Sequence, residues 1–189
     1  MRQRKPRDRI VAAATRLFTD QGILTVGIDA IAAEAGVAVA TIYRQFGGKD
    51  QLVAAALQRW SADWLRWLSA EVARAGQHPA DGLTALWDAF DGWFAGERFR
   101  GSLIANAAVE LRGRPAHPAH AVISAHRTAM GRLLEDVAAR AGARDPGRAA
   151  ERLQVLADGA TAMAATGHRP ELDPGFRALA GAAIAAATQ

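Results

Sequence analysis

The chain of 189 residues contains no cysteine, so disulfide bonds and thiolate metal sites are excluded. No apolar run reaches the roughly 18 residues that a membrane-spanning helix requires, and we expect no membrane partner. The missing cysteines favour a cytoplasmic protein, because disulfides are rare in the reducing cytosol. Runs of β-branched residues are also scarce, which leaves little material for a sheet.

Alanine makes up much of the hydrophobic half of the composition, and alanine is the best helix former. Apolar residues recur at offsets of three, four and seven, the period of an amphipathic helix. We therefore predict an all-α fold of about nine helices, with a small N-terminal domain over residues 1–48 and a larger C-terminal helical domain over residues 49–189. The expected helices span about 7–21, 28–35, 38–46, 49–75, 80–95, 99–111, 119–141, 146–166 and 174–188.

A basic arm precedes the first expected helix. Five of the first nine residues are arginine or lysine and one is aspartate, so this segment accounts for the whole net charge of +4. A positive segment on an otherwise neutral chain suggests an anionic partner. The alternative is a solubilising tail without a partner.

Two short helices around Gly36 are predicted between Ile28 and Phe46. On the second of them Ile42 and Phe46 share one side, while small or polar residues such as Thr41 share the other. A helix with a small and polar outer side can approach base edges in the major groove of DNA. The pattern predicts a helix-turn-helix, and its alternative is a plain helical hairpin that does not contact DNA.

This stretch and its flanks resemble the N-terminal domain of the TetR (tetracycline-repressor) family over about residues 7–60. The resemblance rests on Leu17, Phe18, Gly22, Ile31, Ala32, Ala35, Gly36, Val37, Thr41, Ile42, Tyr43, Phe46, Lys49, Asp50 and Leu52. It implies an N-terminal helix-turn-helix DNA-binding domain and a C-terminal domain for ligand binding and dimerisation. It also implies a transcriptional regulator, most often a repressor, that a small molecule releases from a palindromic double-stranded DNA operator. We expect no cofactor.

The candidate DNA-binding residues lie in the arm and around the two short helices. They are Arg4, Lys5, Gly27, Ala38, Val39, Ala40, Thr41, Tyr43, Arg44, Gln45 and Lys49. Tyr43, Gln45 and Lys49 are suitable donors to phosphates. A serine usually caps the second helix in the family, and Ala38 loses that cap hydrogen bond, worth about 1 kcal/mol. Because this helix carries little charge, we expect the arm to supply phosphate contacts.

By the same resemblance, the ligand site lies among the helices of the C-terminal domain, where aromatic stripes would face an apolar or aromatic ligand. The candidate ligand-binding residues are Trp60, Trp64, Trp67, Trp87, Phe90, Asn106, Glu110, His126 and Met130. The alternative for the aromatic stripes is ordinary core, which such spacing more often indicates.

The last two helices, about 146–166 and 174–188, are expected to form a homodimer interface, again by resemblance. Close packing of the two copies would use faces of small residues. These faces comprise Ala160, Ala164, Ala180, Ala183 and Ala187. The alternative is that these helices only complete the core of their own chain.

Other classes of function find little in the sequence. Gly47-Gly48-Lys49-Asp50 lacks the first glycine and the Ser/Thr of a P-loop, and no Gly-x-Ser-x-Gly occurs, so we expect no enzyme. His117 and His120 flank Pro118 in a loop, which fits an exposed surface loop better than a metal site. A helical dimeric interaction module without DNA binding is the alternative function, but it leaves the basic arm unexplained.

Deleting residues 2–5 should weaken operator binding and flatten its dependence on salt concentration, because each lost phosphate contact lowers the number of counterions released. Titrations of a labelled operator at several salt concentrations measure both quantities. An unchanged affinity with an unchanged salt slope would show that the arm does not contact DNA.

Overall fold

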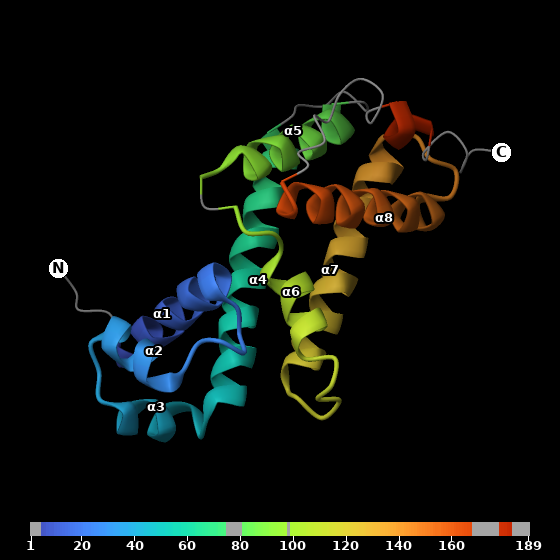
Figure 1. Cartoon of the computed structure of the whole chain (residues 1–189). Helices are drawn as coiled ribbons and strands as arrows, with labels where there is room; N and C mark the ends of the chain where they lie inside the picture. The colour runs from blue at the N-terminus through green and yellow to red at the C-terminus, as the bar shows by residue number, and fades with distance from the viewer. Residues whose placement is uncertain (1–4, 75–80, 98, 168–177, 183–189) are drawn as a thin grey trace. The chain divides into compact units, whose positions relative to one another are not determined.

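The computed structural model of the chain describes residues 5–74, 81–97, 99–167 and 178–182 (Figure 1). This part of the chain is helical and contains no strand, which confirms the predicted all-α fold. The bounded helices are α1 (Pro6–Gln21), α2 (Ile28–Ala35), α3 (Val39–Phe46), α4 (Lys49–Arg74), α5 (Asp81–Ala95), α6 (Leu103–Glu110), α7 (Ala119–Arg140) and α8 (Pro146–Ala165). Residues 178–182 are helical as well, and the expected start of the last helix at 174 lies outside the described residues.

The contacts within the chain define two compact units. Unit 1 comprises residues 1–63 and 102–126, and unit 2 comprises residues 64–101 and 127–189. Helices α4 and α7 contribute residues to both. The functional division at residue 48 remains a prediction, whereas the contacts join the first half of α4, α6 and the start of α7 to α1–α3.

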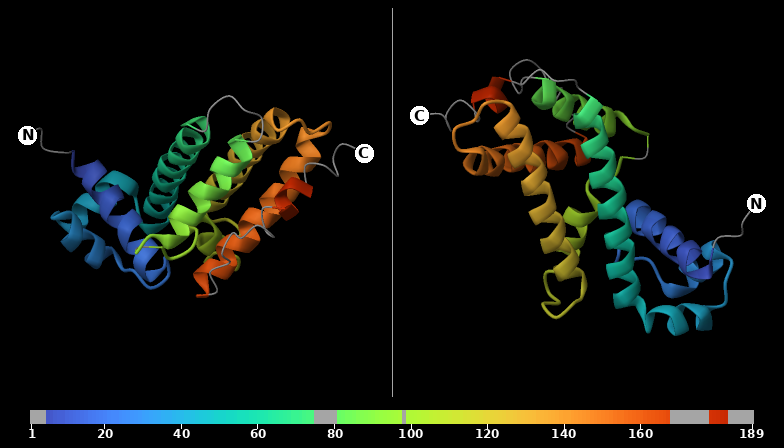
Figure 2. Two further views of the ribbon diagram at one scale, coloured as in Figure 1. Left: turned by 90° about the horizontal axis from the view of Figure 1, so that it is seen from above. Right: turned by 180° about the vertical axis from the view of Figure 1, so that it is seen from behind.

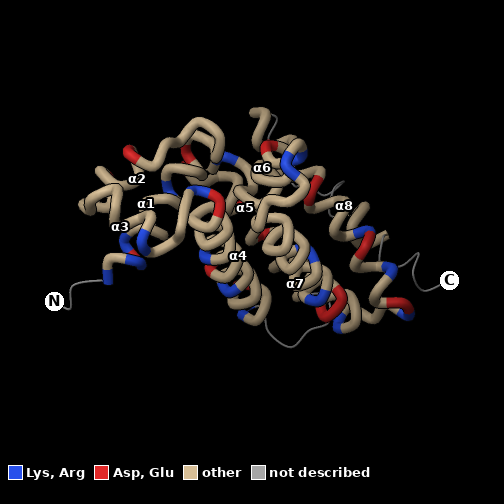
Figure 3. Tube along the Cα trace, turned by 90° about the horizontal axis from the view of Figure 1, so that it is seen from below, with Lys and Arg blue, Asp and Glu red and all other residues tan. Residues whose placement is uncertain are grey.

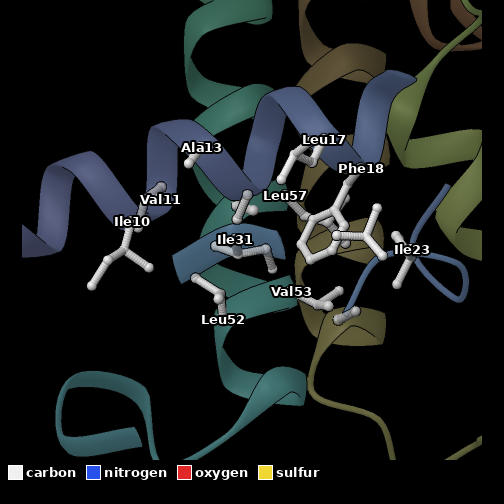
Figure 4. Packing of buried hydrophobic residues seen from close by; sticks show 14 of the residues in the cluster. Ile10, Val11, Ala13, Leu17, Phe18, Ile23, Ile31, Leu52, Val53 and Leu57 are labelled. Carbon is white, nitrogen blue, oxygen red and sulfur yellow. The ribbon is translucent and has the colours of Figure 1, made fainter. Parts of the chain in front are cut away.

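The core of unit 1 begins with side chains from α1, α2 and α4 that meet in one apolar cluster (Figure 4). Phe18 of α1 is 1% exposed, and Ile31 of α2 and Leu57 of α4 are fully buried. Burying a large aliphatic or aromatic side chain contributes roughly 1.5–3 kcal/mol. The cluster also includes Ile42 and Phe46 of α3. It therefore stabilises α2 and α3, which have eight residues each and are too short to be stable alone.

Helix α6 and the beginning of α7 complete the same core. Figures 1 and 2 show α1–α3 on one side of the first half of α4 and these two elements on the other. The buried residues that they add are Leu103, Ile104, Ala107, Leu111, Ala119 and Ile123. Unit 1 is thus a single packed body that includes more than the helix-turn-helix.

Helix α6 is shorter than the predicted helix over 99–111. Gly101 has a φ of 80°, a left-handed conformation that interrupts a helix. Ser102 then caps the new helix, because its Oγ accepts a hydrogen bond from the N–H of Ala105 at 3.3 Å. The prediction overlooked this Gly-Ser stop-and-start signal.

Helix α8 starts as the sequence predicts. The Asp145 carboxylate accepts a hydrogen bond from the N–H of Arg148 at 3.0 Å, and Pro146 occupies the first turn, where its missing N–H costs nothing.

Within the described ranges, none of the helices is long and apolar enough to cross a membrane.

Candidate nucleic-acid interface

The turn between α2 and α3 has the geometry of a helix-turn-helix. Gly36 ends α2 in a left-handed conformation, with φ 61° and ψ 46°, which glycine adopts without steric cost. The N–H of Gly36 donates to the carbonyl of Ala33 at 3.1 Å, and the N–H of Val37 donates to that of Ala32 at 3.0 Å. The chain therefore leaves α2 abruptly and enters α3 at Val39.

The two sides of α3 differ in burial. Ile42 is fully buried and Phe46 is 8% exposed, so both anchor the helix in the core of unit 1. Val39 and Thr41 are half-buried. The exposed candidates on and around the two helices are Gly27, Ala38, Ala40, Tyr43, Arg44 and Gln45. The outer side of α3 is consequently small at its beginning and polar toward its end.

Neither helix of the motif has a side-chain cap at its beginning. Gly27 precedes α2 and Ala38 precedes α3, and no side chain accepts a hydrogen bond from the first turn of either helix. This agrees with the prediction for Ala38. The missing cap costs about 1 kcal/mol, which is less than the burial of Ile42 and Phe46 supplies.

Arg9 holds the turn from outside the motif. Its guanidinium Nη2 donates to the carbonyl of Gly36 at 2.6 Å, and a hydrogen bond from a charged donor is stronger than a neutral one. A second link joins the same helices, because Arg16 of α1 forms an ion pair with Glu34 of α2. Sequence reasoning missed Arg9, since no local pattern connects residues 27 positions apart.

Lysine and arginine gather at the beginning of α1 (Figure 3), whereas α3 carries one cation, Arg44. Lys5 is exposed, and Arg7 stacks over the ring of Phe46 at 5.0 Å from its centre. Arg7 and Gln45 border a surface cleft of about 290 Å³ beside the end of α3. Arg4 lies outside the described residues. Arg7, which belongs to the basic arm expected to supply phosphate contacts, thus lies beside the end of α3.

Lys49, a predicted phosphate contact, is half-buried at the beginning of α4. Its ammonium group lies 3.5 Å from the carbonyl oxygen of Leu24 in the loop between α1 and α2. Burial lowers the pKa of Lys49, while the carboxylates of Asp50 and Glu110 oppose that shift. Two of the three donors of the ammonium group are not needed for this contact.

Four predicted ligand-binding residues belong to unit 1. His126 bonds through Nδ1 to the hydroxyl of Ser61 at 2.8 Å, and its ring lies 5.9 Å from that of Trp60. Asn106 is exposed. Glu110 instead accepts a hydrogen bond from the N–H of Leu24 at 2.8 Å, a contact that the sequence did not predict.

The other five predicted ligand-binding residues belong to unit 2. Trp87, Phe90 and Met130 are 1%, 2% and 3% exposed. The ring of Trp64 lies 5.9 Å from that of Phe90 and 6.3 Å from that of Trp67, in tilted or edge-on arrangements that aromatic rings favour. The rings pack as core residues, which was the alternative for the aromatic stripe, and their role in binding remains a prediction.

His117 is buried, contrary to the predicted surface loop. Its side chain is 1% exposed, its Nδ1 accepts a hydrogen bond from the N–H of Ala119 at 3.1 Å, and its Nε2 lies 3.3 Å from the carboxylate of Asp50. The imidazole therefore caps α7 and faces α4. In the described part of the chain, no group of three or more His, Cys, Asp or Glu side chains could hold a metal ion.

Comparison with known proteins identifies the class. The sequence profile of the bacterial regulatory proteins of the tetR family matches residues 10–56. A crystal structure of a TetR-family transcriptional regulator from Streptomyces coelicolor is 31% identical, with a TM-score of 0.81 over 97% of this chain and 96% of that one. A TetR transcriptional regulator from Legionella pneumophila shares the fold at 17% identity, with a TM-score of 0.79 over 97% of this chain and all of that one.

Two curated regulators match over shorter stretches. The HTH-type transcriptional regulator LmrA of Bacillus subtilis is 36% identical over 81 residues, which are 42% of this chain and 43% of that protein. The HTH-type transcriptional regulator HbdR of an Aromatoleum strain is 47% identical over 47 residues, which are 25% of this chain and 20% of that protein. The matches thus span less than half the length of either protein. The full-length relative, the family profile and the fold together show that the chain belongs to the TetR family of transcriptional regulators.

The stability of the protein should fall as the pH drops below about 6.5, in part because of His117. Burial lowers the pKa of His117, with the Asp50 carboxylate opposing the shift, so the folded chain binds this proton less readily than the unfolded chain. Urea unfolding at about pH 7.5 and 5.5 measures the effect. His117→Asn, which keeps an acceptor for the α7 cap, should show a smaller loss than the native protein.

The control is His120→Asn at the beginning of α7, which leaves the buried His117 in place and should retain most of the native pH dependence. An identical loss of unfolding free energy in the native protein and in His117→Asn would contradict the role assigned to His117.

Proposed function

We propose that the protein is a repressor that binds a palindromic operator as a homodimer and leaves it when a small molecule binds. The buried anchors of α3, together with its small and polar outer side, carry this proposal. A helix held in this way fits the major groove, with Ala38 and Ala40 allowing close approach and Thr41 offering a hydroxyl to a base.

Phosphate contacts would come from the rim of α3 and not from its centre. Tyr43 is 52% exposed and Gln45 is exposed, so both can donate to the DNA backbone. Arg7 and Lys5 add charge at the start of α1, and Lys49 does so at the start of α4. This distribution makes binding dependent on salt, as expected when charged groups supply affinity and α3 supplies sequence preference.

The homodimer surface we propose is the outer face of α8. The predicted small residues Ala160 and Ala164 are 3% and 7% exposed and pack into the core of their own chain, as does Ala180. Ala183 and Ala187 lie outside the described residues. The opposite side of α8 exposes apolar and small residues at helical spacing. These are Val155, Gly159, Ala162 and Met163, with Val155 71% and Met163 50% exposed.

An apolar or aromatic ligand would bind among the aromatic side chains of the C-terminal helices. The protein has a conformation that binds DNA and one that does not. The ligand can release the operator only if it binds the second conformation more tightly than the first. Each 1.4 kcal/mol of that preference changes operator affinity about tenfold. The tight packing of Trp87 and Phe90 means that a ligand touching them must displace packed rings.

A mobility shift with the DNA that flanks the gene should reveal a palindromic, salt-sensitive site. Thr41→Ala should relax the preference at one base pair of each half-site, by about 1–3 kcal/mol. Tyr43→Ala should instead weaken binding to all sequences alike, since it contacts phosphate. If Thr41→Ala weakened binding to all sequences equally, Thr41 would not take part in base recognition. If the native protein showed no sequence-dependent DNA binding, the helical interaction module would be favoured.

Val155→Glu should convert the dimer into monomers, because pairing α8 with a second copy would bury the new carboxylate. Sedimentation velocity at micromolar concentration measures the assembly. Ala139→Glu, at an exposed position of α7, is the matched control and should remain dimeric. A dimer that survives Val155→Glu unchanged would place the interface elsewhere.

A further inference from the structure

The peptide group of Leu24, in the loop between α1 and α2, is held on both sides. Its N–H donates to the Glu110 carboxylate at 2.8 Å, and its carbonyl oxygen lies 3.5 Å from the Lys49 ammonium. The same carboxylate lies close over Gly22, where an added Cβ would come within 3.3 Å of Oε1. Glu110, the last residue of α6, therefore contacts this loop at both Gly22 and Leu24.

A second set of contacts joins the segment after α6 to the beginning of α4. Arg114 donates to the Asp50 carboxylate at 2.6 Å, and Nε2 of the buried His117 lies 3.3 Å from the other oxygen of that carboxylate. An exposed ion pair alone contributes little. The imidazole, whose side chain is 1% exposed, adds a contact to Asp50 that solvent screens less than the exposed pair.

The two sets of contacts bracket the helix-turn-helix in the sequence. Leu24 precedes α2 by four residues, and Asp50 follows α3 by four residues. The buried residues of α6 and the start of α7 belong to the same core as Ile31 and Ile42. The segment from Glu110 to His117 thus attaches to both ends of the motif, and attachment at both ends fixes the orientation of a rigid body.

We propose that Glu110, with Arg114 and His117, forms a clamp that positions the DNA-reading helices on the rest of unit 1, with Glu110 as its main positioning residue. The proposal rests on the proposed DNA binding. The clamp acts without touching DNA, because it holds the orientation in which α3 enters the groove. In a dimer, that orientation determines which spacing of half-sites both copies can reach together.

The test measures the affinity of the full-length protein for its operator and for operators with one base pair added or removed between the half-sites. The native protein should bind the altered operators at least about tenfold more weakly. Glu110→Asp, which is too short to reach Leu24, should lose about three- to tenfold on the natural spacing and lose much of its discrimination between spacings. Its salt slope should stay native, since no phosphate contact is removed.

Glu110→Gln is the matched control, because its amide oxygen can still accept the Leu24 N–H. It should keep the native spacing preference. A native spacing preference in Glu110→Asp would overturn the clamp, and so would an equal loss of that preference in Glu110→Gln.

Amide hydrogen exchange at Leu24 separates this proposal from the proposed function. Glu110→Asp should speed exchange of this amide at least about tenfold, and Glu110→Gln should leave it slow. If the native protein binds no DNA, the proposed function fails. The clamp is tested separately, because fast exchange of the Leu24 amide in the native protein would overturn it. Fast exchange throughout the core of unit 1 would show that a variant has lost global stability. A changed spacing preference in such a variant would count against the clamp.

Discussion

The burial of Ile42 and Phe46 is the interaction on which the DNA-reading surface depends. Helix α3 has eight residues and no side-chain cap, so it is not stable by itself. Two buried side chains contribute roughly 1.5–3 kcal/mol each, more than the roughly 1 kcal/mol lost with the cap. Because both anchors point inward, the small residues of α3 are left on the outside, where a nucleic acid can approach them.

The contacts that hold α3 and its flanking loop come from several neighbouring elements. Arg9 fixes the turn through the carbonyl of Gly36, and Arg7 stacks on Phe46 beside the end of α3. Glu110 holds the preceding loop, 86 residues away in the sequence. A family helix with few charges of its own is thereby supplied with donors and with a fixed orientation by neighbouring elements. In our proposals the clamp sets the orientation of α3, whereas the arm contributes electrostatic affinity for DNA.

Local patterns predicted the helices well, because the signals lie within short stretches of sequence. They are the period of apolar residues, the turn at Gly36 and the helix start at Asp145-Pro146. The same reasoning failed at Gly101-Ser102, where a short stop signal lies inside an apolar stretch, and at His117, whose burial depends on Asp50 from a distant helix. It placed Ala40, Arg44 and Gln45 correctly on the exposed side of α3, whereas Thr41, expected on the same side, is half-buried. It could not show that Ala160 faces inward or that Glu110 meets Leu24, because long-range packing decides both.

Methylation interference on the operator tests the central claim most directly, because methyl groups on guanine N7 block only the major groove. The account predicts interference at two clusters of guanines whose centres are about one helical turn or a multiple of it apart, on one face of the duplex. Binding that is insensitive to methylation at N7 throughout the site would contradict the placement of α3 in the major groove.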